Sequence, residues 1–567
     1  MNRRDFVATT AAMALGIAGT SRAGHDAPTP ASEGTHAMKR FLRVGKNGYF
    51  RFDDGQAYLP LGGFYGNFVH PVVDGKVSED RIGSIRDSTE DQKRAWFKVL
   101  AKNGVNCLRI MSRDHAKRGV DEWDKVGGVN EGLLEAWESY WDVAREYGIY
   151  ILPTIHESFY ADYAPYRKAD VMQRMVVPLY AEGEIAALPD YRRRFLEGRQ
   201  LDDPMAMYTD ADIVRARKDY VDALIPRLRE HPSILFYELE NEQAVGFYDW
   251  TEMNLGWIRA HDDKTPICIS HSGAGLMTAD PIPHSRRTGI DFYSYHIYPV
   301  DRVCQAELDY GMAVSMLARY AMCGVPAGPG ESGSHIIENG PTGRWRYALA
   351  RDTAWFPFLS GNNHVMFWDA AHPEVAACKA VAEVAGLLDL ARFQRKRPTI
   401  AVDVSHALED DIYFRGEQGY AAYTVMGQYE NHFARLGVDF DYAFGGEGYD
   451  TVLPGDRFEA YTPPERPFTL SEGYQLRYMA AADDSAVAVY IRNAGENVRI
   501  GKDWHAGWVR KPIAAPFQLG VTLQGVYEGF LHTFDDETRE DVRIDGQGRV
   551  GRAEPADRDF LLYLKRV

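Results

Sequence analysis

The chain alternates short apolar runs with segments of helical periodicity, and this alternation limits the folds open to it more than any other feature. The expected strands are residues 58–64, 105–111, 149–155, 234–242, 266–271, 290–298, 324–331 and 365–368. Strands that alternate with helices favour a parallel sheet, because each helix returns the chain to the same edge. Eight such repeats place the chain in the α/β class and predict a closed (β/α)8 TIM barrel over residues 41–395.

Two smaller domains are expected after the barrel. Residues 396–466 contain a strand, an Ala-rich aromatic helix, a second strand and a Pro-rich linker, which together predict a small α/β module. Residues 467–567 contain short apolar runs separated by turn residues, a pattern typical of a β-sandwich. A chain of 567 residues is long enough for one large core and both additions.

The first 23 residues carry an export pattern. Arg3 and Arg4 precede an apolar run, and Ser21-Arg22-Ala23 provides a cleavage site with small residues. This order predicts a twin-arginine signal peptide and a periplasmic or extracellular protein. The apolar run is too short for a membrane anchor. Residues 24–40, rich in Ala, Pro, Thr, Ser and His, predict a flexible tether.

Charge and residue spacing argue against several kinds of partner. The formal net charge of −17 disfavours nucleic acid and anionic membranes as partners. The five cysteines show no metal-ligand spacing and are interpreted as buried thiols. The histidines lack a tight metal-ligand pattern, and no glycine-rich phosphate loop follows a strand, so neither a metal nor another cofactor is predicted.

Two of the expected strands end in a glutamate. Residues 234–242 end at Glu242, and residues 324–331 end at Glu331. The carboxyl ends of barrel strands face one mouth, so both carboxylates are expected in a single cleft. Retaining cleavage of a glycosidic bond needs two carboxyl groups about 5–5.5 Å apart, one as acid/base and one as nucleophile. The sequence therefore predicts a glycoside hydrolase.

The fourth strand also carries a motif. The run Tyr237-Glu238-Leu239-Glu240-Asn241-Glu242 resembles the fourth-strand signature of clan A retaining glycoside hydrolases, in particular the family-five cellulase and mannanase type. Residues 106–109, 291–299 and 367–369 are similar to the second, sixth and eighth strands of the same group. The resemblance covers the barrel alone.

This resemblance implies roles for the residues at the strand ends. It implies that Glu242 is the acid/base, that Glu331 is the nucleophile and that Asn241 binds the 2-hydroxyl of the sugar. His296 and Tyr298 are implied to be positioning residues in the substrate-binding cleft.

Three further residues are candidates for substrate binding. The resemblance implies that Trp368 is the floor of the cleaved subsite, because flat sugar faces stack on aromatic rings; packing within the barrel is the alternative. Arg109 is a candidate donor in the cleft and also the expected buried partner of Glu238, which strand alternation places deeper in the barrel. His156 follows the third strand and either lines the cleft or belongs to the core.

The chain departs from the family pattern at two positions. Glu240 stands where a small residue is usual, and Gln243 stands where Pro is frequent. The extra carboxylate of Glu240 is expected either to reshape the cleft or to raise the proton affinity of Glu242. A long segment, residues 159–209, is expected to lie over the catalytic face and to favour short substrates.

The leading hypothesis is an exported retaining β-glycoside hydrolase that acts on oligo- or polysaccharides by double displacement, without a cofactor. Two alternatives stay open: a non-catalytic carbohydrate-binding barrel, and a transglycosylase that uses the same residues. The module at residues 396–466 resembles the trimerisation-type domain of some clan A β-galactosidases, which makes homo-oligomerisation a further hypothesis.

Overall fold

The computed structural model describes residues 39–567 except 65–68, 79–86, 113–122, 158–175, 200–205, 244–247, 272–285, 300–302, 334–342, 406–416 and 502–506. The predicted signal peptide and nearly all of the predicted tether therefore lie outside the described residues. Among the helices of the described part, none is both long enough and apolar enough to cross a membrane.

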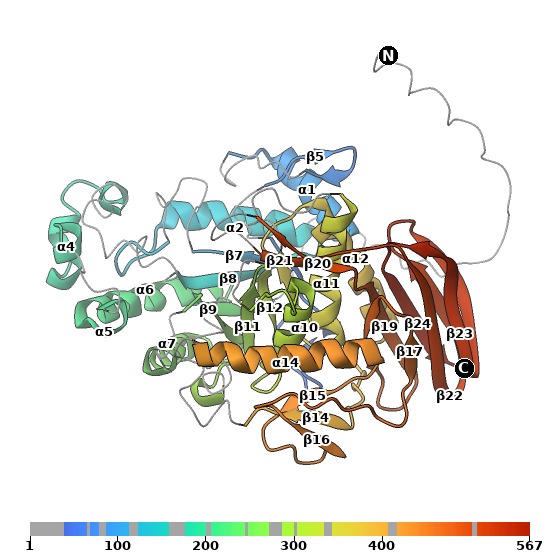
Figure 1. Cartoon of the computed structure of the whole chain (residues 1–567). Coiled ribbons are helices and arrows are strands. Elements are labelled where there is room, and N and C mark those ends of the chain that lie inside the picture. Colours follow the sequence, from blue (N-terminus) through green and yellow to red (C-terminus); the bar gives the residue numbers. More distant parts are fainter. Residues whose placement is uncertain are drawn as a thin grey trace.

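A sheet of eight strands forms the centre of the molecule (Figure 1). The strands follow one another in the order β12 (Ala327–Ser332), β11 (Phe292–Ile297), β10 (Ile267–His271), β9 (Tyr237–Asn241), β8 (Tyr150–Glu157), β7 (Cys107–Ile110), β4 (Leu61–Gly63) and β13 (Val365–Phe367). All neighbouring strands in this order are parallel. Hydrogen bonds from Asn363 N to Ala327 O and from Trp368 N to Ser332 O, both 2.9 Å, join β13 to β12. The predicted (β/α)8 barrel is thereby confirmed.

Helices between the strands cover the barrel. They are α1 (Glu90–Lys102), α2 (Glu131–Glu146), α6 (Ala211–Leu228), α7 (Tyr248–His261), α10 (Tyr310–Ala321), α11 (Arg344–Leu359) and α12 (His372–Leu387). A capping box of Thr89 and Gln92 starts α1. Asp309 caps α10 by accepting from Gly311 N at 3.0 Å. Helix α10 therefore begins directly after this cap.

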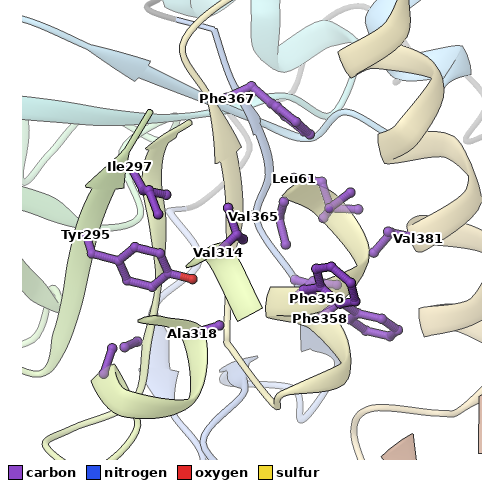
Figure 2. Packing of buried hydrophobic residues seen from close by; sticks show 14 of the residues in the cluster. Leu61, Tyr295, Ile297, Val314, Ala318, Phe356, Phe358, Val365, Phe367 and Val381 are labelled. Atoms are coloured by element: carbon purple, nitrogen blue, oxygen red, sulfur yellow. The ribbon is translucent and has the colours of Figure 1, made fainter. Parts of the chain in front are cut away.

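Buried apolar side chains pack between the barrel and its outer helices. Figure 2 shows Val365 of β13 beside Phe356 and Phe358 of α11, with Val381 of α12 on the other side of these rings. These four side chains are buried. Burial of each is worth about 1.5–3 kcal/mol, so this layer stabilises the barrel wall that carries β12 and β13.

A small three-stranded sheet precedes the barrel and covers the amino-terminal end of the barrel. Strands β1 (Leu42–Val44), β2 (Phe50–Phe52) and β3 (Ala57–Tyr58) form a separate antiparallel sheet. Phe50 packs on the barrel residue Phe292 with ring centroids 5.0 Å apart. The expected single strand over residues 58–64 is wrong, because Pro60 has no N–H and separates β3 from β4.

A segment between β8 and α6 builds a small cluster of its own. It contains the short helices η3 (Val177–Leu179), η4 (Ile185–Ala187), α4 (Asp190–Leu196) and α5 (Ala206–Thr209). Buried side chains of this segment pack with Ile213 of α6 and Trp250 of α7. Figure 1 shows α4 and α5 beyond the outer ends of α6 and α7. Residues 159–175 and 200–205 of the expected insertion lie outside the described residues.

Two further units follow the barrel. The first has the parallel strands β15 (Asp441–Ala443), β14 (Ile400–Asp403) and β16 (Thr451–Pro454) and the long helix α14 (Glu417–Leu436). The second is an antiparallel sheet of β17 (Phe468–Leu470), β22 (Ala515–Thr533), β24 (Phe560–Arg566), β19 (Ala486–Asn493) and β18 (Tyr474–Ala480), with β23 (Thr538–Ala556) paired to β22. Strands β20 (Glu496–Ile500) and β21 (Gly507–Lys511) form a separate two-stranded ribbon.

Candidate active site

The two strand-end glutamates meet at the mouth of the barrel. Glu331 lies in β12, and Glu242 directly follows β9. Three atoms lie within 4.8 Å of one another: a carboxylate oxygen of Glu242, a carboxylate oxygen of Glu331 and a ring nitrogen of His296. Both glutamates are buried, with 9 % of Glu242 and 3 % of Glu331 exposed. This proximity is close to the separation of about 5–5.5 Å that retaining glycosidases use.

The backbone at Glu242 has an unusual conformation. Its φ is 50°, a value that residues with a side chain adopt at a cost in free energy. Its N–H donates to Ser270 Oγ at 3.0 Å, and Ser270 Oγ donates to Glu240 O at 3.3 Å. Ser270 therefore fixes the chain where Glu242 leaves the strand. Sequence reasoning missed this residue, although its position near the end of an expected strand was a usable signal.

The backbone of β12 passes close to β11 at the site. A Cβ atom at Gly330 would collide with Ser294 Oγ and lie 3.1 Å from His296 Nε2. The register between the two strands shifts here, so that His296 pairs with Glu331. The glycine therefore permits the close approach that places Glu331 beside His296.

Two donors hold the carboxylate of Glu331. Arg109 Nη1 donates to its Oε1, and the Tyr298 hydroxyl donates to its Oε2. Burial, reinforced by the negative charge of Glu331, raises the pKa of Tyr298 well above its usual value. Tyr298 thus stays protonated and remains a donor at neutral pH. Both contacts favour the ionised form of Glu331, which is the form that a nucleophile requires.

Arg109 connects the site to the barrel interior. Its Nε donates to Glu238 Oε2 at 2.7 Å, and its Nη2 donates to Asn241 Oδ1 at 2.6 Å. The prediction that Glu238 is the buried partner of Arg109 is confirmed. One guanidinium therefore orients Asn241 and Glu331 together, through the planar fork that suits this residue.

His296 lies between the two acids. Its Nδ1 is 2.8 Å from Glu242 Oε1 and 3.6 Å from Glu331 Oε2. Burial, followed by the positive charge of Arg109, lowers the pKa of His296 well below its usual value. The ring is therefore neutral at neutral pH. A neutral ring can donate to the carboxylate of Glu242 or accept from its carboxylic acid, depending on the tautomer.

Trp368 and His156 have different surroundings. Trp368 follows β13 and is half-buried, and its ring meets that of Tyr298 edge-on with centroids 6.5 Å apart. His156 lies in β8, where its Nε2 is 3.0 Å from Asn254 Oδ1 and its ring packs on Tyr220 and Trp250. The structure thus brings Trp368 next to the acid pair through Tyr298, whereas the contacts of His156 are with helices α6 and α7.

Glu240 belongs to the same outer cluster as His156. Its carboxylate accepts from Arg217 Nη1 at 3.3 Å and from Trp250 Nε1 at 2.9 Å. Arg217 lies in α6 and Trp250 in α7. These contacts show Glu240 as a buried link between the acid/base strand and two helices. Sequence reasoning did not find this role, because strand alternation alone would point Glu240 to the same side as Glu238.

The cluster of Glu242, His296 and Glu331 also has a spacing that could hold a metal ion. Ligation by Glu331 would compete with the two hydrogen bonds from Arg109 and Tyr298. The positive charge that a metal would supply is already provided by Arg109. The donor set therefore fits a pair of working carboxyl groups better than a cation site.

Parts of this chain are similar to known proteins. No family model matches the chain. A probable mannan endo-1,4-beta-mannosidase F from Emericella nidulans is 31% identical over 111 residues, which is 16% of this chain and 26% of that protein. A probable mannan endo-1,4-beta-mannosidase A from Aspergillus clavatus is 27% identical over 124 residues, which is 18% of this chain and 34% of that protein. These relatives confirm the resemblance to family-five glycoside hydrolases of clan A.

The match with these relatives spans only about a quarter to a third of their length. Among solved structures, an exo-beta-1,4-mannosidase from an Opitutaceae bacterium has a TM-score of 0.48 at 14% identity, covering 73% of this chain and 72% of that one. An endo-1,4-beta-D-mannanase from Thermotoga petrophila has a TM-score of 0.41 at 16% identity, covering 58% of this chain and all of that one, 100%.

Proposed function

We propose that this protein hydrolyses β-mannosidic bonds with retention of configuration, by double displacement. The observation that carries the proposal is the pair formed by Glu242 and Glu331, whose carboxylate oxygens come within 4.8 Å at the mouth of the barrel. Glu331 carries donors on both oxygens and is assigned as the nucleophile. Glu242 faces the neutral ring of His296 and is assigned as the acid/base.

In the first step, Glu331 attacks the anomeric carbon and forms a covalent glycosyl ester. The bond from that carbon to the leaving oxygen breaks, and the carboxylic acid of Glu242 gives its proton to this oxygen. Arg109 stabilises Glu331 before the attack, and Tyr298 keeps one of its oxygens oriented. The leaving sugar departs with the proton, and Glu242 is left as a carboxylate.

In the second step, the Glu242 carboxylate takes a proton from a water molecule that attacks the same carbon. The ester bond to Glu331 breaks, and both residues return to their starting forms. His296 Nδ1, 2.8 Å from Glu242, donates to the carboxylate in the tautomer with the proton on Nδ1 and accepts from the carboxylic acid in the tautomer with the proton on Nε2. Two inversions at one carbon give net retention.

The proposed substrate class is a mannose-containing oligo- or polysaccharide. The relatives that match the chain by sequence are named for action on mannan. Asn241, fixed by Arg109 at 2.6 Å, is proposed to bind the hydroxyl next to the anomeric carbon. The half-buried ring of Trp368 is proposed to stack on the sugar face. Export through residues 1–23 remains part of the proposal.

Two matched variants test the assignment of the acids. Glu242→Gln should lower kcat/KM on mannobiose by about 10²–10⁴-fold, because general acid catalysis contributes that much. The same variant should lose far less activity on an aryl β-mannoside with a good leaving group, which needs little protonation. Glu331→Gln should abolish turnover of both substrates, because it removes the attacking group. An equal loss on both substrates in Glu242→Gln would contradict the assignment.

The same assays separate the two alternatives. A non-catalytic binding barrel would bind manno-oligosaccharides and hydrolyse no aryl glycoside. A transglycosylase would form longer products when acceptor sugar is added, at the expense of free mannose. The proposal predicts hydrolysis as the main outcome at low acceptor concentration, as measured by chromatography of the products.

A further inference from the structure

A ribbon from the C-terminal sheet reaches the barrel. Strands β20 and β21 leave the sheet after β19 and return to it at β22, and they pair only with each other among the described residues. Figure 1 shows both strands lying across the barrel side of the molecule, away from the sheet. The ribbon is therefore a projection of one domain over another.

The base of the ribbon is fixed to the barrel by buried charges. Arg510 of β21 is fully buried, and its Nε donates to Asp352 Oδ2 at 2.6 Å. Asp352 lies in the barrel helix α11. Arg510 Nη2 also donates to Asp559 Oδ2 of the sheet at 2.9 Å. Breaking a buried pair of this kind leaves an uncompensated charge, so the base of the ribbon is held firmly.

Further contacts hold the ribbon along its length. Asn497 Nδ2 donates to Ala306 O at 2.7 Å, which ties β20 to the loop before α10. The indole of Trp345, at the start of α11, donates to the carbonyl of Arg510. Val498 and Ile500 pack against the same core that includes the barrel. One face of the ribbon is thus part of the barrel packing.

The far end of the ribbon touches the segment that follows β11. Gly507, the first residue of β21, is buried, and a Cβ atom there would lie 2.5 Å from the carbonyl carbon of Pro299 and collide with its oxygen. Pro299 is also buried and directly follows Tyr298. The hydroxyl of Tyr298 donates to Glu331. A backbone contact therefore lies one residue away from a donor to the proposed nucleophile.

We propose that the β20–β21 ribbon is a positioning element of the active site. Its contact between Gly507 and Pro299 holds the backbone of Tyr298, and so keeps the Tyr298 hydroxyl on Glu331. The C-terminal sheet is then part of the catalytic unit rather than an independent appendage. This inference rests on the proposed function, because it assigns the ribbon an effect on the nucleophile.

The contact has a measurable consequence. A side chain at residue 507 must displace either the ribbon or Pro299, since the obstructing atoms belong to the backbone. A misplacement of 1 Å at a catalytic group can cost about 10²-fold in rate. Loss of the Tyr298 hydrogen bond would also weaken the preference for ionised Glu331. The acid limb of the kcat/KM profile would then move to higher pH.

The test is a double-mutant cycle with Gly507→Ala and Tyr298→Phe, assayed on an aryl β-mannoside. We expect Gly507→Ala to lower kcat by about 10- to 10²-fold with little change in KM, and to move the acid limb to higher pH. The losses in kcat of the two single variants should not multiply in the double variant, because both substitutions disturb the same hydrogen bond. The control is Arg499→Ala, an exposed position of the same ribbon, which should retain the kcat and pH profile of the parent protein.

Several results would overturn the proposal. One is that Gly507→Ala keeps the pH profile of the parent protein. Another is that the losses in kcat caused by Gly507→Ala and Tyr298→Phe multiply in the double variant. A third is that Arg499→Ala loses as much kcat as Gly507→Ala. If circular dichroism shows that Gly507→Ala does not fold, Asn497→Ala is used in its place. An unchanged acid limb of the kcat/KM profile in Asn497→Ala would then overturn the proposal. Absence of hydrolysis by the parent protein would instead refute the proposed function, and the role of the ribbon with it.

Discussion

Arg109 is the residue on which the buried charges of the site depend. Its side chain is 1% exposed and contacts two carboxylates, those of Glu238 and Glu331. Charges removed from water are tolerated only when they are paired and hydrogen-bonded. The same residue orients Asn241, so stability and proposed catalysis share one guanidinium.

Replacement of Arg109 should therefore damage folding as well as activity. Arg109→Met leaves two carboxylates in the barrel without this cation, and we expect the free energy of unfolding in urea to fall by about 3–5 kcal/mol. The control is Arg94→Met, which removes an exposed ion pair with Glu146 and should change stability by about 0–1 kcal/mol. Equal stabilities for the two variants would refute this account of Arg109.

Strands show most clearly what the sequence could predict. The apolar runs located seven of the eight barrel strands to within a few residues, and their ends located Glu242, Glu331 and the partner of Arg109. The contacts of Glu240 were not predictable, because two-residue alternation would point it to the same side as Glu238, whereas it binds Arg217 of α6 and Trp250 of α7. The three-stranded sheet of β1, β2 and β3 was missed because strands of two or three residues leave almost no periodic signal.

The ribbon escaped prediction for a different reason. Its hold on the barrel comes from Arg510 and Asp352, which are far apart in the chain and have no local pattern that would pair them. The contact of Gly507 with Pro299 depends likewise on the packing of two domains. Local sequence signals describe elements, and such contacts arise only when the elements are assembled.

At the level of elements, the outer cluster should matter for stability. Trp250→Phe keeps an aromatic ring in α7 but removes the 2.9 Å hydrogen bond to buried Glu240. We expect a loss of about 1–3 kcal/mol in the free energy of unfolding, the usual cost of a missing partner for a buried polar group. Trp257→Phe, at a half-buried position of the same helix, is the control and should cost less. Equal costs would show that the indole N–H has no special role.

The whole molecule is joined by buried ion pairs between the barrel and the sheet. Arg492 and Arg510 of the sheet domain pair with Asp309 and Asp352, which lie at the start of α10 and within α11. Pairs that need both domains favour cooperative unfolding. Homo-oligomerisation stays a prediction at this scale, and sedimentation velocity tests it.

Acid should unfold the two domains together. Burial alone would raise the pKa of Asp559, but Arg510 and Arg351 outweigh it and lower the pKa to about 2 from 3.8. The stability from this group is therefore complete above about pH 3.8 and is lost as the pH falls towards 2. Calorimetry at pH 7 should show a single thermal unfolding transition. Asp559→Asn should lower the midpoint temperature of this transition. Two separate transitions for barrel and sheet would contradict this.

The central claim is that Glu331 becomes covalently bonded to the sugar during turnover. In a 2-deoxy-2-fluoro-β-mannosyl fluoride, the fluorine at C2 slows both steps through their oxocarbenium-like transition states, and the fluoride leaving group keeps the first step fast, so the ester should accumulate. Peptide mass spectrometry of the inactivated protein is predicted to place one added fluorosugar on Glu331. A label on another residue, or a first product of inverted configuration with no label at all, would contradict the account.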